Sequence, residues 1–205
     1  MPERRLKPRK VPGQLRALET RGRLLEAAAR VFAAHGYAAG TTNRIAEEAG
    51  HSIGSLYQYF PNKDAILLEL ASAHARAGIS AIEQRLAEGL PDALDDRIRL
   101  FVQAALDNHR DDPALHAVLF EQAPRPPEFA AFLRDAERGA VETAAALLGA
   151  DPTVTVADVP MAAFLTVTTI ESSVHRFIAR DPSEPTDRFE NELVTMLVRY
   201  LTTPP

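Results

Sequence analysis

Apolar residues recur at helical spacing through almost the whole chain from Arg21 onward, and this periodicity is the strongest constraint on the fold. Proline and glycine interrupt the pattern at intervals, which divides it into helices of ordinary length. The expected helices cover about 21–36, 43–49, 53–60, 62–70 and beyond, 92–110, 113–122, 127–149, 157–180 and 186–202. The best candidate strand, residues 153–156, is short and has nothing to pair with. The sequence therefore predicts an all-α protein.

Charge is distributed unevenly along the chain. Residues 1–63 carry 11 Lys and Arg against 5 Asp and Glu, whereas residues 64–205 carry 12 against 23. A basic end on an acidic body predicts that the N-terminal part meets a polyanion, although a solvated charged tail is the alternative. Residues 1–20 combine three prolines with basic residues and lack an apolar period, so we expect a flexible arm there.

Several classes of function are excluded or disfavoured by what the 205 residues lack. The chain has no cysteine, which rules out disulfides and thiol catalysis. No apolar run approaches the roughly 20 residues of a membrane span, and no apolar signal segment follows the basic N-terminus, so we expect a cytoplasmic protein that does not contact a membrane. No paired-carboxylate motif or glycine-rich phosphate loop stands out, and we expect neither catalysis nor a cofactor.

Residues 50–54 read Gly-His-Ser-Ile-Gly, which matches the Gly-x-Ser-x-Gly pattern of a serine hydrolase nucleophile elbow. That elbow requires a buried strand directly before the motif. The preceding residues are instead polar and helical in period, so Ser52 is not expected to be a nucleophile. As a helix N-cap Ser52 fits well, because its hydroxyl can accept a hydrogen bond from an early backbone N–H.

The same residues predict a helix-turn-helix. Thr41 and Thr42 offer N-cap hydroxyls for a first short helix that ends at Gly50, and Ser52 begins the second. Leu56 and Phe60 lie four residues apart and are expected to fix the inner face of the second helix.

Residues 21–70 resemble the DNA-binding domain of the TetR family of transcriptional regulators. The motifs that carry the resemblance are FAAHGY, then TT..IA..AG, then S.GSLYQYF..K...LL. The resemblance implies a three-helix DNA-binding domain over 21–75, with its helix-turn-helix at about 41–60. It also implies a larger helical domain over 76–205 that dimerises and binds a small, largely apolar ligand. The implied function is a ligand-responsive regulator, more specifically a repressor of a palindromic double-stranded DNA operator.

The family's DNA contacts can be transferred to matching positions of this sequence. The resemblance places phosphate contacts at Thr42, Ser55, Tyr57, Tyr59 and Lys63, and base contacts at Asn43, Arg44, Ile53 and Gly54. The full set of predicted DNA-binding residues is Thr42, Asn43, Arg44, Ser52, Ile53, Gly54, Ser55, Tyr57, Tyr59 and Lys63.

Three of these residues also have a purely structural interpretation. Tyr57 could be a core aromatic, Arg44 a solvated arginine, and Lys63 a charge that neutralises a helix end. Two positions depart from the family pattern: His51 replaces the usual valine, and Ile53 stands where many members have a polar residue. Since Ile53 cannot donate a hydrogen bond, its available contact is a thymine methyl.

The last two expected helices differ in apolar pattern. Helix 157–180 is apolar on most of its faces, whereas 186–202 carries one apolar stripe. The resemblance implies that both pair with a second subunit; a monomer that buries helix 157–180 in its own centre is the alternative. The predicted interface residues are Phe164, Val167, Ile170, Val174, Phe177, Leu193, Met196, Leu197 and Tyr200.

A ligand cavity is predicted between helices of the C-terminal domain. Its predicted lining is Phe101, Phe120, Phe132, Phe164, Thr168 and His175, although ordinary core residues would look the same. A body without a ligand, which serves only assembly, is therefore the rival function. His109 and His116 are interpreted as ordinary surface histidines, so no metal site is expected.

Overall fold

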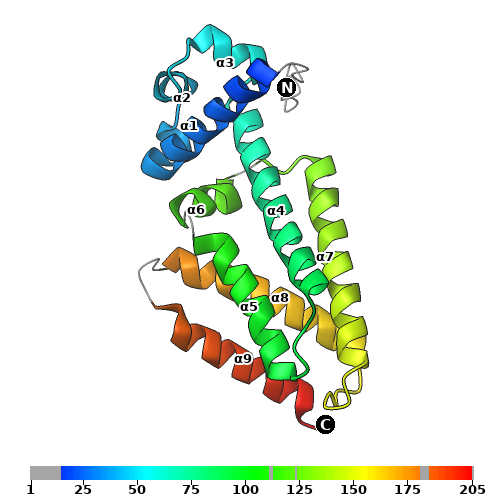
Figure 1. Ribbon diagram of the computed structural model, residues 1–205. Coiled ribbons are helices and arrows are strands. Elements are labelled where there is room, and N and C mark those ends of the chain that lie inside the picture. The colour runs from blue at the N-terminus through cyan, green and yellow to red at the C-terminus, as the bar shows by residue number, and fades with distance from the viewer. Residues whose placement is uncertain (1–14, 111–112, 123, 181–184, 205) are drawn as a thin grey trace. The chain divides into compact units, whose positions relative to one another are not determined.

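The computed structural model describes residues 15–110, 113–122, 124–180 and 185–204, and these form helices without any strand (Figure 1). The all-α prediction is therefore confirmed. In chain order the helices are α1 (Leu15–Ala39), α2 (Thr42–Glu48), α3 (Ile53–Tyr59), α4 (Lys63–Glu88), α5 (Leu94–Arg110), α6 (Pro113–Gln122), α7 (Pro127–Gly149), α8 (Val159–Arg180) and α9 (Thr186–Thr202).

The chain forms two compact units. Unit 1 consists of residues 1–74 and 112–126, and unit 2 of residues 75–111 and 127–205. Helix α4 runs through the boundary, so its first part up to His74 belongs to unit 1. Helix α6 packs on α1 and is part of unit 1 as well, although the sequence analysis assigned it to the C-terminal domain.

Helix α1 begins at Leu15, earlier than the sequence suggested. The segment 15–20 was predicted as part of the flexible arm, and it is helical; residues 1–14 lie outside the described residues. The predicted stop at Gly36 is present as a break in α1, where the backbone takes φ 67°. A residue with a side chain rarely adopts this conformation, so glycine suits the position.

Unit 1 is held together by the inward faces of its short helices. Helices α2 and α3 pack on each other, and α2 also packs on α1. The largest side chains without exposed surface in this unit are Leu24, Phe32, Ile45, Leu56, Phe60, Ile66 and Leu67. Because α2 and α3 have only seven residues each, this shared core fixes their positions.

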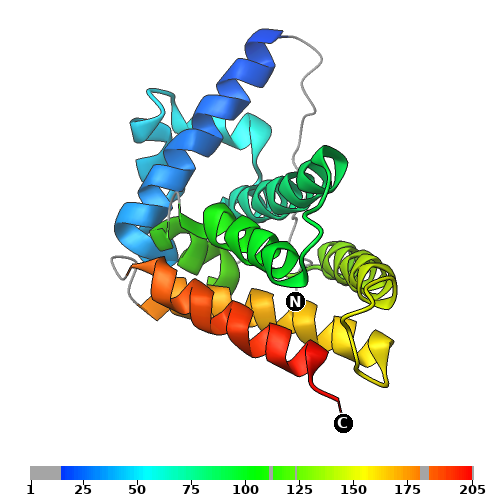
Figure 2. The same ribbon diagram turned by 60° about the horizontal axis from the view of Figure 1, so that its bottom comes forward.

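Unit 2 has its core between α5, α8 and α9. Helix α8 packs on α5 and α7, α9 packs on α5, and α8 and α9 lie side by side (Figure 2). Polar links join the same helices: the Arg99 guanidinium donates to the Glu190 carboxylate on α9 at 2.8 Å, and Arg97 pairs with Asp151 after α7. The buried apolar core includes Val102, Leu106, Ile170, Val174, Leu193, Leu197 and Leu201.

Candidate DNA-binding site

The turn between α2 and α3 is built from backbone hydrogen bonds and one glycine. The Gly50 N–H donates to the Glu47 carbonyl at 3.0 Å, and the His51 N–H donates to the Ala46 carbonyl at 2.9 Å. Gly50 has φ 68°, the left-handed conformation that lets a helix end in this way. The chain therefore reverses direction within four residues and begins α3 at Ile53.

Both short helices begin with a side-chain cap. Ser52 accepts a hydrogen bond from the Ser55 N–H at 3.1 Å, and its hydroxyl lies 3.0 Å from that of Ser55. Thr41 accepts from the Arg44 N–H at 3.3 Å at the start of α2. Ser52 is thus the N-cap of α3, as the sequence predicted. Its hydroxyl oxygen is occupied by the hydrogen bond from the Ser55 N–H.

Tyr57 lies on the outer face of α3. Its ring is 40% exposed, and its hydroxyl lies 3.2 Å from the Thr42 hydroxyl on α2. The alternative interpretation of Tyr57 as a core aromatic does not hold, because Leu56 and Phe60 fill that place and are fully buried. The Thr42–Tyr57 hydrogen bond links the start of α2 to the second half of α3.

The remaining predicted DNA contacts also lie on the surface of unit 1, to different degrees. Asn43, Arg44, Ser52, Ile53 and Gly54 are exposed, whereas Thr42, Ser55, Tyr59 and Lys63 are half-buried. Arg44 makes no ion pair within the described residues, so its guanidinium is available to an anion. The ten predicted residues therefore lie on α2, on α3 and its N-cap, and at the start of α4.

Lys63 has partners inside unit 1. Its ammonium donates to the Tyr37 carbonyl at 2.7 Å and to the Ala38 carbonyl at 3.4 Å, and it lies 4.0 Å from the centre of the Tyr37 ring. These contacts stabilise the C-terminal end of α1, which is the structural interpretation that the sequence left open. An ammonium has three donors, so one N–H remains for the predicted phosphate contact.

The residues predicted to line a ligand cavity have different surroundings. Phe101 packs against the core of unit 2, the Thr168 hydroxyl donates to the Phe164 carbonyl of its own helix at 2.8 Å, and Phe164 is 43% exposed. Phe132 stacks on Phe129, and the side chain of Phe120 lies outside the described part of the chain.

Open hollows lie on the described part of unit 2. One of about 550 Å³ is lined by Val156, Ala157, Asp158, Met161, Arg199, Tyr200 and Thr203, and one of about 240 Å³ by Gln103, Leu106, Asp107, Arg110, Thr186, Asp187 and Glu190. None of the predicted cavity residues lines either of them.

The predicted interface residues divide into two groups. Phe164, Met196 and Tyr200 are exposed, and Val167 and Phe177 are half-buried. Ile170, Val174, Leu193 and Leu197 are buried in the core of unit 2, which corrects the prediction for these four. The apolar stripe of each helix was visible in the sequence, but the part that faces the protomer's own core was not.

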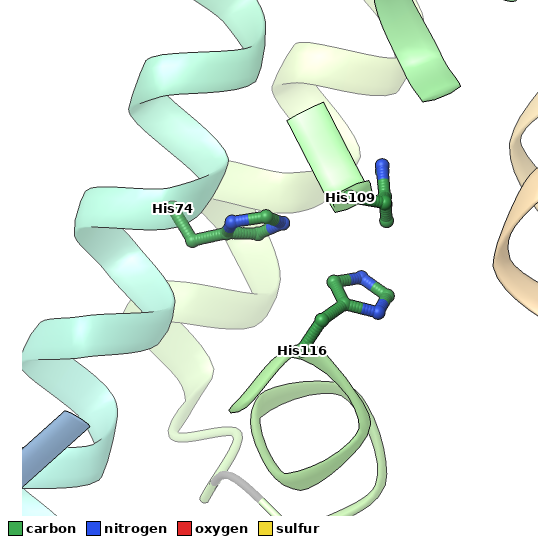
Figure 3. Close-up of side chains that lie close together, drawn as sticks. All are labelled: His74, His109 and His116. Carbon is green, nitrogen blue, oxygen red and sulfur yellow. The ribbon is translucent and has the colours of Figure 1, made fainter. Parts of the chain in front are cut away.

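His109 and His116 are buried, which corrects their interpretation as surface histidines. His116 on α6 lies close to His74 on α4, with ring centres 5.1 Å apart (Figure 3). Burial lowers the pKa of His74, so this imidazole stays neutral at neutral pH. The pair has ligand nitrogens within 4.8 Å of each other, which is part of what a transition-metal site needs.

A second histidine contact lies within unit 2. His109 Nδ1 lies 2.5 Å from the Ala105 carbonyl oxygen, and its Nε2 lies 3.3 Å from Nε2 of His175 on α8. The carbonyl can only accept, so Nδ1 of His109 carries the proton of the first hydrogen bond. Sequence spacing gave no signal for this contact, because the two residues are far apart in the chain.

Comparison with known proteins agrees with this arrangement along most of the chain. Residues 24–70 match the description "Bacterial regulatory proteins, tetR family", and residues 93–201 match "Tetracyclin repressor-like, C-terminal domain". The HTH-type transcriptional activator FasR of Mycolicibacterium smegmatis is 34% identical over 103 residues, which cover 50% of this chain and 46% of FasR. The HTH-type transcriptional repressor AcnR of Corynebacterium efficiens is 33% identical over 108 residues, which cover 49% of this chain and 56% of AcnR.

The chain spans about half the length of the curated relatives that it matches. Among solved structures, the transcriptional regulator FadR from Bacillus subtilis in complex with stearoyl-CoA has the same fold. Its TM-score is 0.68 at 21% identity, covering 87% of this chain and 97% of that one. With both the N-terminal and the C-terminal family descriptions matched in order, this chain belongs to the TetR family of bacterial regulatory proteins.

Proposed function

We propose that the chain is a sequence-specific DNA-binding transcriptional regulator that contacts DNA through α2, α3 and the start of α4. The observation that carries this proposal is the set of exposed donors, Asn43, Arg44 and Tyr57, held on two short helices whose inner faces are fully buried. A rigid support of this kind lets few side chains select a base sequence, because their positions are fixed before DNA binds.

The donors divide by the part of DNA that they suit. Hydroxyls such as those of Thr42 and Tyr57 contact phosphate oxygens and set the position of the protein on the duplex. An arginine can donate to both O6 and N7 of guanine, and an asparagine can pair with N6 and N7 of adenine. Arg44 and Asn43 are therefore the proposed polar readers of base edges.

DNA binding can be tested by fluorescence anisotropy with an operator selected from a random pool. We expect the operator to bind at least about 10³-fold more tightly than a scrambled duplex at the same salt concentration. The double variant Asn43→Ala/Arg44→Ala should lose most of this preference and keep the smaller part that other side chains contribute, while Arg138→Ala, an exposed arginine of α7, should bind like the wild type. Equal wild-type affinity for the two duplexes would reject the proposal.

We further propose that two copies of the chain pair through α8 and α9. Five large apolar side chains are exposed there, and we call them the α8–α9 face: Met161, Phe164, Leu165, Met196 and Tyr200. The open hollow beside Met161 and Tyr200 continues the same surface. An exposed cluster of large apolar side chains commonly marks a surface that binds another protein, and a second copy of the chain would cover this one. Sedimentation should give twice the chain mass of 22.4 kDa, and a particle near 22.4 kDa at micromolar concentration would contradict pairing.

The proposed mode of regulation is repression that a small, largely apolar molecule relieves. FadR of similar fold was solved with stearoyl-CoA, which supports ligand binding by this kind of helical body. The ligand would bind the C-terminal body better in a conformation that fits the operator poorly, so that ligand and operator oppose each other through a reciprocal coupling free energy. Native mass spectrometry of protein purified from its host should show the dimer with added ligand mass; a bare dimer that also binds its operator would favour the rival, a regulator without a ligand.

We also propose a cytoplasmic location, where DNA is accessible. Helix α4 reaches a mean hydropathy of 1.2 over 18 residues, so by length and composition alone it could cross a membrane. Its N-terminal part buries Ala65, Ile66 and Leu67 within unit 1.

A further inference from the structure

The first residue of α3 is an exposed apolar side chain on an otherwise polar surface. Ile53 is 37% exposed and is flanked by Ser52 and Gly54. Apart from its chain neighbours and the backbone of α3, a Cβ added at Gly54 would meet one atom within 4 Å, the Ser52 hydroxyl oxygen at 3.8 Å, so the surface at Gly54 is open. One turn later on the same helix, Tyr57 presents a hydroxyl that Thr42 orients.

An aliphatic side chain in this place can contribute to recognition only by burying apolar surface. In the major groove, the C5 methyl group of thymine is the apolar feature that distinguishes one base pair from the others. Cytosine lacks the methyl, and the purines present hydrogen-bonding atoms instead. The hydroxyls of Ser55 and Tyr57 lie on the same helix and are suited to contact phosphates of the DNA backbone next to the base that Ile53 faces.

We infer that Ile53 recognises the 5-methyl group of a thymine in each operator half-site, an inference that rests on the proposed DNA-binding function. Polar readout then belongs to Asn43 and Arg44 on α2, and methyl readout to the start of α3. Because Gly54 has no side chain, nothing at this position keeps Ile53 away from the edge of the base.

The test removes the methyl group and nothing else. In the selected operator, each thymine is replaced in turn by deoxyuridine, symmetrically in both half-sites, and the dissociation constant is measured for the wild type and for Ile53→Ala. For the wild type we expect the replacement at one symmetric pair of thymines to raise the dissociation constant. The expected increase is about fourfold for each lost methyl group, or about fifteenfold for the pair. For Ile53→Ala the same replacement should change affinity by less than about twofold.

Matched variants separate methyl readout from general loss of affinity. Leu18→Ala removes an apolar side chain of α1 that is 51% exposed, and it should keep the full deoxyuridine effect. Ile53→Val should keep most of it. An unchanged thermal midpoint for Ile53→Ala confirms that the unit is folded, as expected for an exposed position.

Two results would overturn the inference while leaving the proposed function intact. One is specific operator binding with no thymine sensitive to loss of its methyl. The other is a sensitive thymine whose effect is the same in Ile53→Ala. Failure to select any operator would instead reject the proposed function itself, so the two failures are distinguishable.

Discussion

The exposed surface of α2 and α3 and the α8–α9 face differ in chemistry. On α2 and α3 the caps Thr41 and Ser52 and the Thr42–Tyr57 pair hold small polar groups in place through local hydrogen bonds. On α8 and α9 the exposed residues are large and apolar, and methionine and aromatic side chains predominate.

This difference separates two kinds of partner. A polar surface with oriented donors is stable in water and can bind and release a polyanion repeatedly, since its contacts are salt-dependent and wet. Burial of a large apolar surface away from water lowers the free energy of the complex. Such a surface is therefore suited to a permanent partner with an apolar surface of its own. These properties support the two proposals, DNA as the partner of the polar surface of unit 1 and a second copy of the chain as the partner of the α8–α9 face.

The largest expected effect is on pairing. Phe164→Asp places a carboxylate in the middle of the α8–α9 face, where burial of an uncompensated charge costs roughly 3–5 kcal/mol. We expect dimers to dissociate at micromolar concentration in sedimentation velocity. Leu18→Asp, at an equally exposed apolar residue of unit 1, should remain dimeric; dissociation of both variants, or of neither, would remove the distinction between the two surfaces.

Truncating the support of α3 should cost nearly as much, but as folding stability. Leu56 is fully buried, so Leu56→Ala should lower the free energy of unfolding by about 2–5 kcal/mol. Its exposed neighbour gives the control: Tyr57→Phe should stay within about 0.5 kcal/mol. Urea unfolding at one protein concentration measures both, and a similar loss in the two variants would mean that the hydrogen bond between Tyr57 and Thr42 contributes as much to folding as the buried Leu56 side chain.

Asn43→Ala should relax the preference at one base pair of each half-site by roughly 1–3 kcal/mol. Dissociation constants for the operator and its single-base variants, at fixed salt, give this directly. If affinity drops by the same factor for every sequence, Asn43 contacts the backbone and is not a base reader.

The N-cap of α3 should contribute about 1 kcal/mol. Ser52→Ala removes the acceptor for the Ser55 N–H and should lower the free energy of unfolding by that amount. Ser52→Asp keeps an acceptor and should restore stability, yet it adds a negative charge beside the DNA and should weaken operator binding. Stability that is indifferent to both changes would show that Ser52 is not a significant cap.

The smallest effect concerns pH. Because burial lowers the pKa of folded His74 below its ordinary value of about 6.5, the unfolded chain binds a proton that the folded chain excludes. The free energy of unfolding should therefore fall as pH drops through about 6.5 and level off above it. In His74→Gln this part of the pH dependence should disappear; an unchanged profile would assign it to other groups.

The local features of helices α1, α2 and α3 could be predicted from the sequence. Two glycines end or break a helix through their backbone conformation, Gly36 and Gly50. Two hydroxyl residues, Thr41 and Ser52, each accept a hydrogen bond from a backbone N–H three residues later. Such features need no knowledge of the tertiary fold, and their positions agree with the structure.

Long-range features could not be read in the same way. Lys63 reaches carbonyls 26 and 25 residues earlier, and His109 meets His175 from another helix. The sequence showed that α8 and α9 are apolar but not that Leu197 faces inward while Met196 faces outward. Those distinctions depend on how the helices pack, which periodicity alone does not determine.

The central claim is that α2 and α3 read DNA while the α8–α9 face pairs two copies. Selection of bound duplexes from a random pool, followed by native mass spectrometry of the complex, tests both parts at once. We predict a palindromic sequence with half-sites one helical turn apart, about 34–36 Å, or a multiple of it, bound in units of two chains. An enriched sequence without two-fold symmetry, bound by a single chain, would contradict the claim.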